Sequence, residues 1–220
     1  MTVREQPEGR QQATRDALIA AAMRLFGGQG FNGTSIRQIA GEAGTNSASI
    51  AYHFGGKDGL RVACAQTIAT RMSAVLEPVL TNAGPDPDPQ TAARTLEQLA
   101  ATMAQFILVR PEAENIAPFM LREVAEAGAV LEIMLEKVIG PMHGRVCQLW
   151  AVATGQPAES DESRLTVFTM IGQILYFRIG REVVKCRMGW ERIGSAEADT
   201  ITATIARNVR AIIAAERSAQ

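Results

Sequence analysis

The chain has 220 residues, 47% of them hydrophobic and 20% charged, a composition typical of globular proteins with a substantial core. Its net charge of −1 excludes a strong overall positive field, so any binding of nucleic acid would have to rest on local geometry. The sequence has no apolar run long enough to predict a membrane span, and its three widely spaced cysteines without a CxxC motif favour a reduced, cytoplasmic protein.

Apolar residues recur at intervals of three and four, which predicts an all-α fold because this spacing lines one face of a helix. The polar residues 1–12 are expected to form a disordered arm. A first helix should begin near Thr14 and end at GGQGF, which starts at Gly27, since glycines adopt left-handed conformations at low cost.

Two short helices are predicted next, separated by EAGTN. Thr34 is the expected N-cap of the first and Asn46 of the second, in which Ile50 and Phe54 should face inward. The pair predicts a helix-turn-helix within a domain that covers residues 13–58. Its first helix is expected to hold the apolar residues Ile36, Ile39, Ala40 and Ala43.

Residues 59–220 are predicted to form a second, larger helical domain. The prolines of NAGPDPDPQ cannot occupy a helix interior, so Asn82 to Pro89 should be a loop. The expected helical stretches are Lys57 to about Leu80, Thr91 to Val109, Pro111 to Thr154, Glu162 to Arg187 and Ala196 to Arg217.

The second short helix is small and polar where good packing residues would be expected, at Ser47, Ala48 and Ser49. A major groove about 12 Å wide admits a helix whose outer face is small and forms hydrogen bonds, so we interpret this helix as a DNA-reading helix. On the motif alone, an ordinary turn or a helix that docks a protein partner remains an alternative, as does a solvated surface charge for Arg37. The candidate DNA contacts are Thr34, Arg37, Thr45, Ser47, Ala48, Ser49, Tyr52, His53 and Lys57.

The stretch ALIAAAMRLFGGQGFNGTSIRQIAGEAGTNSASIAYHFGGKDGL, from Ala17 to Leu60, resembles the N-terminal DNA-binding domain of the TetR family of bacterial transcriptional repressors. The resemblance implies a homodimer, with one such domain per subunit and a variable C-terminal ligand domain. SIAYHFGGKDGL and the proline-rich loop after it are also similar to a CerR-type subgroup, defined by its C-terminal domain.

The resemblance also implies roles for individual residues. At two positions the chain departs from the family pattern: Ala51 replaces a common tyrosine, and Ser47 stands where lysine is frequent. Affinity is therefore expected to rest more on Arg10 and Arg15. The phosphate-contacting positions of the family fall on Thr34, Tyr52, His53 and Lys57, and the base-reading positions fall on Ser47, Ala48 and Ser49.

The segment from Arg164 to Val184 is apolar on more than one helical face, which favours burial by a second subunit. Together with the stripe of the last helix, it predicts a twofold four-helix dimer interface, and a purely internal core is the alternative. The predicted interface residues are Leu165, Phe168, Gly172, Tyr176, Ile179, Ile201, Ile205, Val209 and Ile212.

Methionines and aromatic residues in the middle helices suit a pocket for a bulky small molecule, although each one taken singly fits a core position equally well. The candidate ligand-binding residues are Met103, Phe106, Phe119, Met120, Glu123, Met134, His143, Trp150, Gln173, Phe177 and Arg178. His143 and Cys147 share a helical face, but two ligands do not make a metal site, so neither a metal nor a cofactor is predicted.

These patterns, with the resemblance, predict a DNA-binding regulator and not an enzyme, because no nucleophile–base arrangement stands out. The partners expected are double-stranded DNA, an unidentified small-molecule effector and a second copy of the chain, without a membrane. The predicted mechanism is a repressor that binds a palindromic operator as a homodimer and is released by the effector. The residues alone do not distinguish a repressor from an activator.

Overall fold

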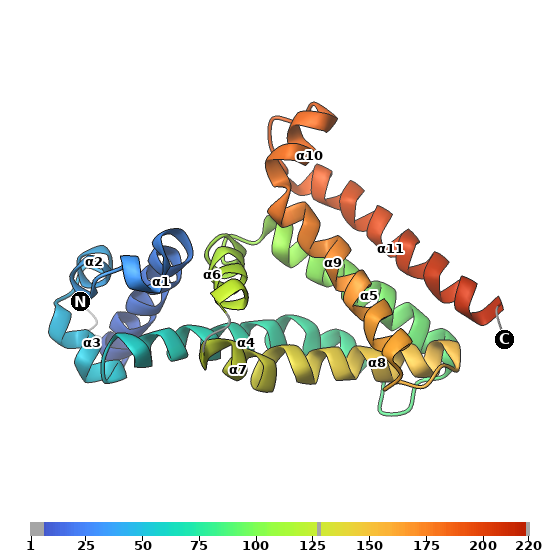
Figure 1. Cartoon of the computed structure of the whole chain (residues 1–220), viewed down its shortest axis with the longest axis horizontal. Coiled ribbons are helices and arrows are strands. Elements are labelled where there is room, and N and C mark those ends of the chain that lie inside the picture. The colour runs from blue at the N-terminus through green and yellow to red at the C-terminus, as the bar shows by residue number, and fades with distance from the viewer. Residues whose placement is uncertain (1–6, 127–128, 219–220) are drawn as a thin grey trace, which may run out of the picture. The chain divides into compact units, whose positions relative to one another are not determined.

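The computed structural model describes residues 7–126 and 129–218, and in these residues the regular elements are helical (Figure 1), which confirms the all-α prediction. The elements are α1 (Pro7–Gly33), α2 (Ile36–Glu42), α3 (Ser47–Phe54), α4 (Lys57–Asn82), α5 (Pro89–Val109), α6 (Ala113–Glu126), α7 (Ala129–Met134), the π-helical turn η1 (Leu135–Ile139), α8 (Gly140–Thr154), α9 (Asp161–Ile179), α10 (Arg181–Met188) and α11 (Ser195–Ser218). Each described helix is too short or too polar to cross a membrane.

The chain forms two compact units. The first unit consists of residues 1–69 and 114–137, and the second unit consists of residues 70–113 and 138–220. The predicted domains 13–58 and 59–220 divide the chain differently, because α6 and α7 belong with the helix-turn-helix. A prediction that divides the chain at a single position cannot describe units that are each formed from two separate stretches.

Helix α1 is longer than predicted. Residues 1–6 of the expected arm lie outside the described residues, but from Pro7 onward the arm is helical, since proline is well suited to a first helical turn. The Thr14 hydroxyl donates to the Arg10 carbonyl at 2.9 Å inside the helix and caps nothing. Instead of ending the helix at Gly27, the glycine-rich stretch breaks it at Gly30, where φ is +79°.

In the first unit, α6 packs directly on α1 through Gly27. A Cβ at this position would lie 3.0 Å from the Phe119 amide nitrogen and 3.1 Å from Pro118 Cβ, so the close approach depends on glycine. The Phe119 ring centre lies 6.4 Å from that of Phe26. The largest buried side chains of this unit include Leu18, Ile19, Met23, Phe26, Ile39, Ile50, Leu60, Ile68, Phe119 and Met134.

In the second unit, α5 packs against α8, α9 and α11. The apolar stripe of α11 supplies the core of this unit: Ile201 is 3% exposed, and Ile205 and Val209 are 0% exposed. These three residues were predicted to form the dimer interface, and that prediction is wrong, because a side chain already covered by its own subunit has no surface left for a partner. The periodicity identified a buried face but not what buries it.

Candidate nucleic-acid interface

The helix-turn-helix is held by caps at both short helices. Ser35, and not Thr34, is the N-cap of α2: its side chain accepts from the Gln38 amide at 3.2 Å, and the Gln38 side chain accepts from the Ser35 amide at 2.8 Å. Asn46 caps α3 as predicted, accepting from the Ser49 amide at 3.0 Å. The sequence pattern Ser-x-x-Gln could have identified the first cap.

The outer face of α3 consists of Ala48, Ala51 and Tyr52, all exposed, with Tyr52 at 74%. Their spacing of three and four places them on one side of the helix. Ile50, on the opposite side, is 1% exposed, as predicted for an inward residue. In the sequence, Ala51 was interpreted only as the loss of a tyrosine contact. The structure places its small side chain on this outer face, between Ala48 and Tyr52, so no bulky side chain projects there.

Thr45 and Ser49 are half-buried and engaged with each other, with their hydroxyl oxygens 2.9 Å apart. The Ser49 hydroxyl also donates to the Asn46 side chain at 3.2 Å. These contacts brace the first turn of α3. Ser49 is therefore less available to a base than Ser47 and Ala48, the other two predicted reading residues.

The prediction that Thr34 contacts a phosphate is wrong. Thr34 is 2% exposed, and its hydroxyl donates to the Gly30 carbonyl at 2.8 Å, in the break of α1. Its amide donates to the Phe31 carbonyl at 3.2 Å. Both polar groups are thus used inside the first unit, where they hold the turn that leads into α2. Of the apolar residues in α2, Ile39 and Ala40 are buried, whereas Ile36 is 42% exposed.

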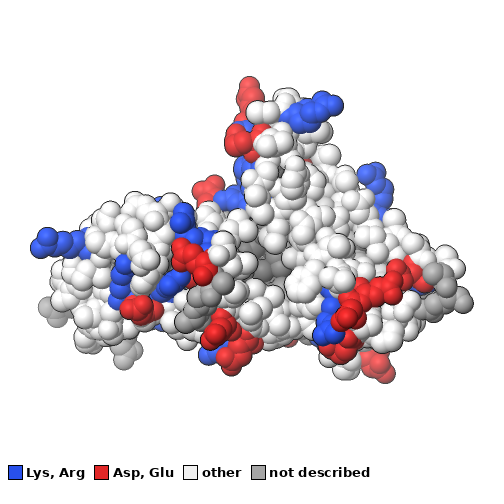
Figure 2. Space-filling view, in the orientation of Figure 1, with Lys and Arg blue, Asp and Glu red and all other residues white. Residues whose placement is uncertain are grey.

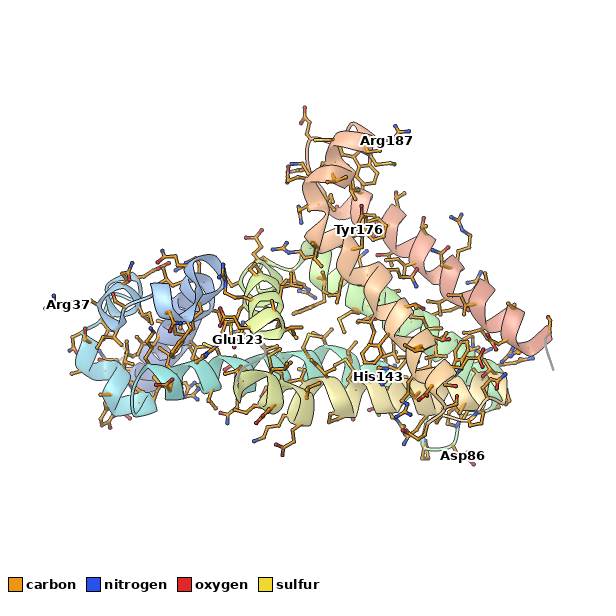
Figure 3. All side chains as sticks on the ribbon, viewed as in Figure 1. Arg37, Asp86, Glu123, His143, Tyr176 and Arg187 are labelled. Carbon is orange, nitrogen blue, oxygen red and sulfur yellow. The ribbon has the colours of Figure 1, made fainter. Side chains whose placement is uncertain are left out.

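The remaining candidate contacts lie on the surface or at helix ends. Arg37 is exposed and extends outward from α2 (Figure 3). Lys57, at the start of α4, places its Nζ 4.2 Å from the centre of the Phe31 ring. His53 is half-buried, and its ring packs edge-on against Tyr52 with the centres 4.9 Å apart. Basic and acidic side chains are interspersed on the face seen in Figure 2, as the net charge of −1 implies.

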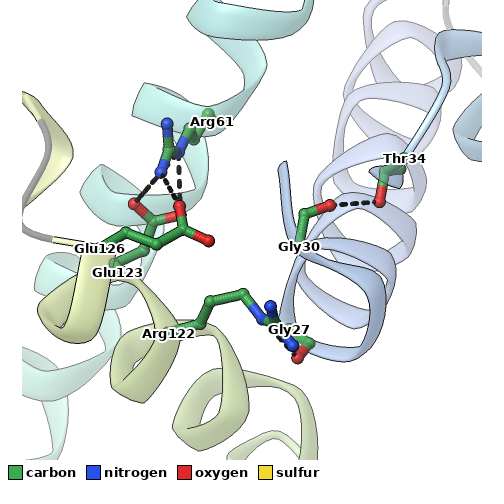
Figure 4. A network of polar contacts seen from close by, with 7 residues as sticks. All are labelled: Gly27, Gly30, Thr34, Arg61, Arg122, Glu123 and Glu126. Atoms are coloured by element: carbon green, nitrogen blue, oxygen red, sulfur yellow. Dashed lines mark hydrogen bonds and ion pairs between the residues drawn. The ribbon is translucent and has the colours of Figure 1, made fainter. Parts of the chain in front are cut away.

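Helix α6 supplies a polar network to the first unit (Figure 4). Glu123 is 1% exposed and accepts from Arg61 Nε at 2.9 and 3.1 Å, while Glu126 accepts from Arg61 Nη2 at 2.9 Å. Arg122 donates to the carbonyls of Gly27 and Gly28 at 3.3 and 3.4 Å. Glu123 was predicted to orient a ligand, but its carboxylate is occupied by Arg61, a partner 62 residues away that no local pattern indicates.

The buried thiol of Cys64 lies close to this network. Burial raises the pKa of Cys64, and the negative charge of Glu123 raises that pKa further. Its Sγ lies 3.8 Å from the Ile19 carbonyl. This cysteine is therefore an unreactive packing residue in the first unit.

The predicted ligand-binding residues do not gather in one unit. Phe119, Met120, Glu123 and Met134 belong to the first unit, and Met103, Phe106, His143, Trp150, Gln173, Phe177 and Arg178 belong to the second. Phe119 is 0% exposed and packs beside Phe26, so it is a core residue. In the second unit, Trp150 is 1% exposed, and its indole Nε1 has no hydrogen-bond partner among the described residues.

His143, on α8, lies between two helices of the second unit (Figure 3). Its Nε2 is 3.1 Å from the Arg164 carbonyl, which can only accept, so Nε2 carries the proton of the neutral ring. Its Nδ1 then faces Cys147 Sγ at 3.6 Å. Burial raises the pKa of the Cys147 thiol. His, Cys, Asp and Glu side chains form no cluster of three or more suited to a metal in the parts of the chain that the structure describes.

The surface of α9 carries most of the other predicted interface residues. Leu165, Phe168, Tyr176 and Ile179 are 64%, 51%, 54% and 62% exposed in the single subunit, and Gly172 between them is also exposed. We call these five residues the α9 stripe. Ile212 of α11 is half-buried.

Comparison with known proteins finds family models that match both the N-terminal and the C-terminal part of the chain. Residues 18–64 match the family model described as bacterial regulatory proteins, tetR family, and residues 92–216 match that of the C-terminal domain of the HTH-type transcriptional dual regulator CecR. The second family is thus CecR and not CerR, and the resemblance seen in the sequence is otherwise confirmed. The chain is 33% identical over 207 residues to the dual regulator CecR of Shigella flexneri, covering 92% of each chain.

Solved structures share the fold. A TetR-like transcriptional regulator from Rhodococcus sp. RHA1 matches with a TM-score of 0.63 at 19% identity, covering 94% of this chain and 98% of that one. The fatty acid degradation regulator FadR from Bacillus halodurans matches with a TM-score of 0.63 at 14% identity, covering 89% and 97%. At these identities the likeness concerns the fold alone.

Proposed function

Because the chain belongs to the TetR family of bacterial transcriptional regulators and carries a C-terminal domain of the CecR family, we propose that it is a ligand-responsive repressor. It is a DNA-binding transcriptional regulator and not an enzyme. In the proposal, it binds a palindromic operator as a homodimer in the cytoplasm, and a small molecule bound by the second unit releases it.

The observation that carries the proposal is the outer face of α3. Ala48 and Ala51 project only methyl groups, so the helix axis can approach base edges closely, and alanine methyls suit contact with thymine methyl groups. Tyr52 is exposed one residue beyond Ala51, where its hydroxyl can reach a phosphate. Lys57 and Arg37 would add two further phosphate contacts, whereas Thr34 takes no part.

The α9 stripe supports the dimer. A row of large apolar side chains, each more than half exposed, is unfavourable in water, and a second copy of the same face would cover it around a twofold axis. Exposed Gly172, within the row, would let two helices approach closely. Two reading helices about 34 Å apart would then match successive major grooves of a palindromic site.

The second unit is the proposed effector domain. The indole N–H of Trp150 is buried without a partner among the described residues, so an effector with an acceptor oxygen would satisfy a group that is costly to leave unpaired. Such a molecule can release DNA only if it binds one subunit arrangement more tightly than the other.

The test is binding of labelled duplex fragments that carry candidate palindromes, measured by fluorescence anisotropy across a range of salt concentrations. Ala48→Glu should abolish specific binding, because a longer acidic side chain would enter the groove. Gln90→Glu, the same charge change at an exposed position of α5, should leave binding unchanged. Lys57→Ala should lower affinity for all sequences and flatten the salt slope by about one unit per lost phosphate contact. Equal binding by the Ala48 and Gln90 variants would refute the interface.

A further inference from the structure

The interaction between Arg61 and Glu123 is unusual for its depth. The Glu123 side chain is 2% exposed and that of Arg61 is 15% exposed, whereas Glu126, which shares the same guanidinium, is 41% exposed. Both oxygens of Glu123 contact Arg61 Nε, and Oε2 also lies 2.8 Å from Nη2. The guanidinium is therefore held in one orientation by α6 (Figure 4).

The same guanidinium lies over Phe31. Arg61 Cζ is 4.4 Å from the centre of the ring, and Lys57 Nζ is 4.2 Å from that centre. Two cations repel each other when they share one ring, and Lys57 and Arg61 also lie one turn apart on α4. Glu123 and Glu126 supply two negative charges against these two positive ones. The carboxylates thus allow both cations to stay on the ring.

This cluster touches both ends of the helix-turn-helix. Phe31 directly follows the break at Gly30 and precedes Ser35, the cap of α2. Lys57 opens α4 just after α3 ends at Phe54. A group that fixes Phe31 and Lys57 relative to each other therefore holds the segment before α2 against the segment after α3.

We propose that Glu123 is a positioning residue for DNA binding, which acts through Arg61 and Phe31 to place Lys57 and α3 for contact with the duplex. The proposal rests on the DNA interface proposed above. It assigns to α6 a function in the DNA-reading unit, although α6 contributes no residue to the outer face of α3.

A purely electrostatic effect of the Glu123 charge would change DNA affinity in the opposite direction. DNA is an anion, so if Glu123 were only a negative charge near the interface, its neutralisation would strengthen binding. If Glu123 positions Lys57, neutralisation weakens binding. The Arg61 guanidinium then loses the carboxylate that orients it, and the positive charges of Lys57 and Arg61 are less well compensated. The direction of the change in DNA affinity therefore distinguishes positioning of Lys57 from simple repulsion between Glu123 and DNA.

The experiment compares Glu123→Gln with Glu126→Gln, which removes the same charge from the same helix but breaks only one contact. Duplex affinity should fall about tenfold in the first variant, within the range for residues that act through a contact network. It should stay within about twofold in the second, because the Glu126 side chain is 41% exposed and its pair with Arg61 is weakened by solvent. Equal changes, or tighter binding by Glu123→Gln, would overturn the proposal.

A double-mutant cycle with Lys57→Ala then tests the route. If Glu123 acts through Lys57, the two losses overlap and the double variant binds almost as well as Lys57→Ala alone. If Glu123 merely stabilises the fold, the losses add, which would contradict the proposal. Arg61→Lys keeps the charge but loses the planar fork, and it should reproduce the loss even if Glu123→Gln folds poorly.

Hydrogen exchange without DNA separates this proposal from the DNA interface itself. Glu123→Gln should speed amide exchange in the segments 31–35 and 55–57, and Glu126→Gln should not. Unchanged exchange would overturn the positioning function whatever the DNA results are. Faster exchange in a protein whose duplex binding is insensitive to Ala48→Glu would retain the positioning of Lys57 and refute only the proposed interface.

Discussion

The close contact at Gly27 allows a quantitative test of how α6 packs on α1. In Gly27→Ala, the new Cβ would lie 3.0 Å from the Phe119 amide nitrogen, 3.1 Å from Pro118 Cβ and 3.3 Å from the Pro118 carbonyl carbon. These are backbone or ring atoms that cannot rotate away, so α6 must shift by a few tenths of an ångström. Overpacking of this kind costs about 1–3 kcal/mol.

Alanine also favours helix over glycine, by about 1 kcal/mol, so the net loss expected for Gly27→Ala is about 0–2 kcal/mol. Gly28→Ala is the matched control, because a Cβ there meets nothing within 4 Å and the residue is exposed in the same helix. It should stabilise the protein by about 0.5–1 kcal/mol. Urea unfolding followed by circular dichroism at fixed temperature gives both free energies of unfolding. If Gly27→Ala proved as stable as Gly28→Ala, the packing argument would be refuted.

Three further predictions concern the cap, the dimer and the acid range. Thr34→Val should lose about 1–3 kcal/mol of stability, because valine leaves the Gly30 carbonyl without its hydrogen-bond donor, and Thr34→Ser should lose less. Neither variant should change the salt dependence of DNA binding, and a weaker salt dependence would show that Thr34 contacts a phosphate. Leu165→Glu combined with Ile179→Glu should shift the protein from dimer to monomer in analytical ultracentrifugation, whereas Leu135→Glu, at a residue 48% exposed outside the α9 stripe, should not. Hydrogen bonds from the Thr91 hydroxyl and amide lower the pKa of Asp88, so the Asp88 cap stabilises α5 at neutral pH, and this contribution is lost as pH falls below about 4. The difference in stability between wild type and Asp88→Ala should therefore be present at pH 7 and vanish in acid. A difference that does not change with pH would contradict this prediction.

Local signals predicted the local structure. The Asn46 cap and the burial of Ile50 depend on residues within a turn or two, so a single stretch of sequence contains the necessary information. The cap of α2 was assigned one residue early because Thr34 and Ser35 are both good capping residues. Only the partner at Gln38 distinguishes them, and it favours Ser35.

Contacts between distant segments were not predictable in this way. The spacing of Ile201, Ile205 and Val209 showed that this face is buried, but a subunit's own helices and a partner's helices produce the same pattern. The pair of Arg61 and Glu123 joins residues 62 positions apart, and nothing near either residue identifies the other. The sequence therefore placed Glu123 in a ligand pocket, where a buried carboxylate without a known partner is a reasonable expectation.

The first unit is assembled from two separate stretches of chain, 1–69 and 114–137. A ribosome completes the helix-turn-helix before it has synthesised α6, so during translation Phe26 has not yet met Phe119 and Arg61 has no carboxylate from Glu123. The nascent DNA-reading unit must remain partly open until residues beyond Glu114 leave the exit tunnel. For the same reason, a truncated gene product that ends at residue 69 would expose apolar surface and become a substrate for chaperones and proteases.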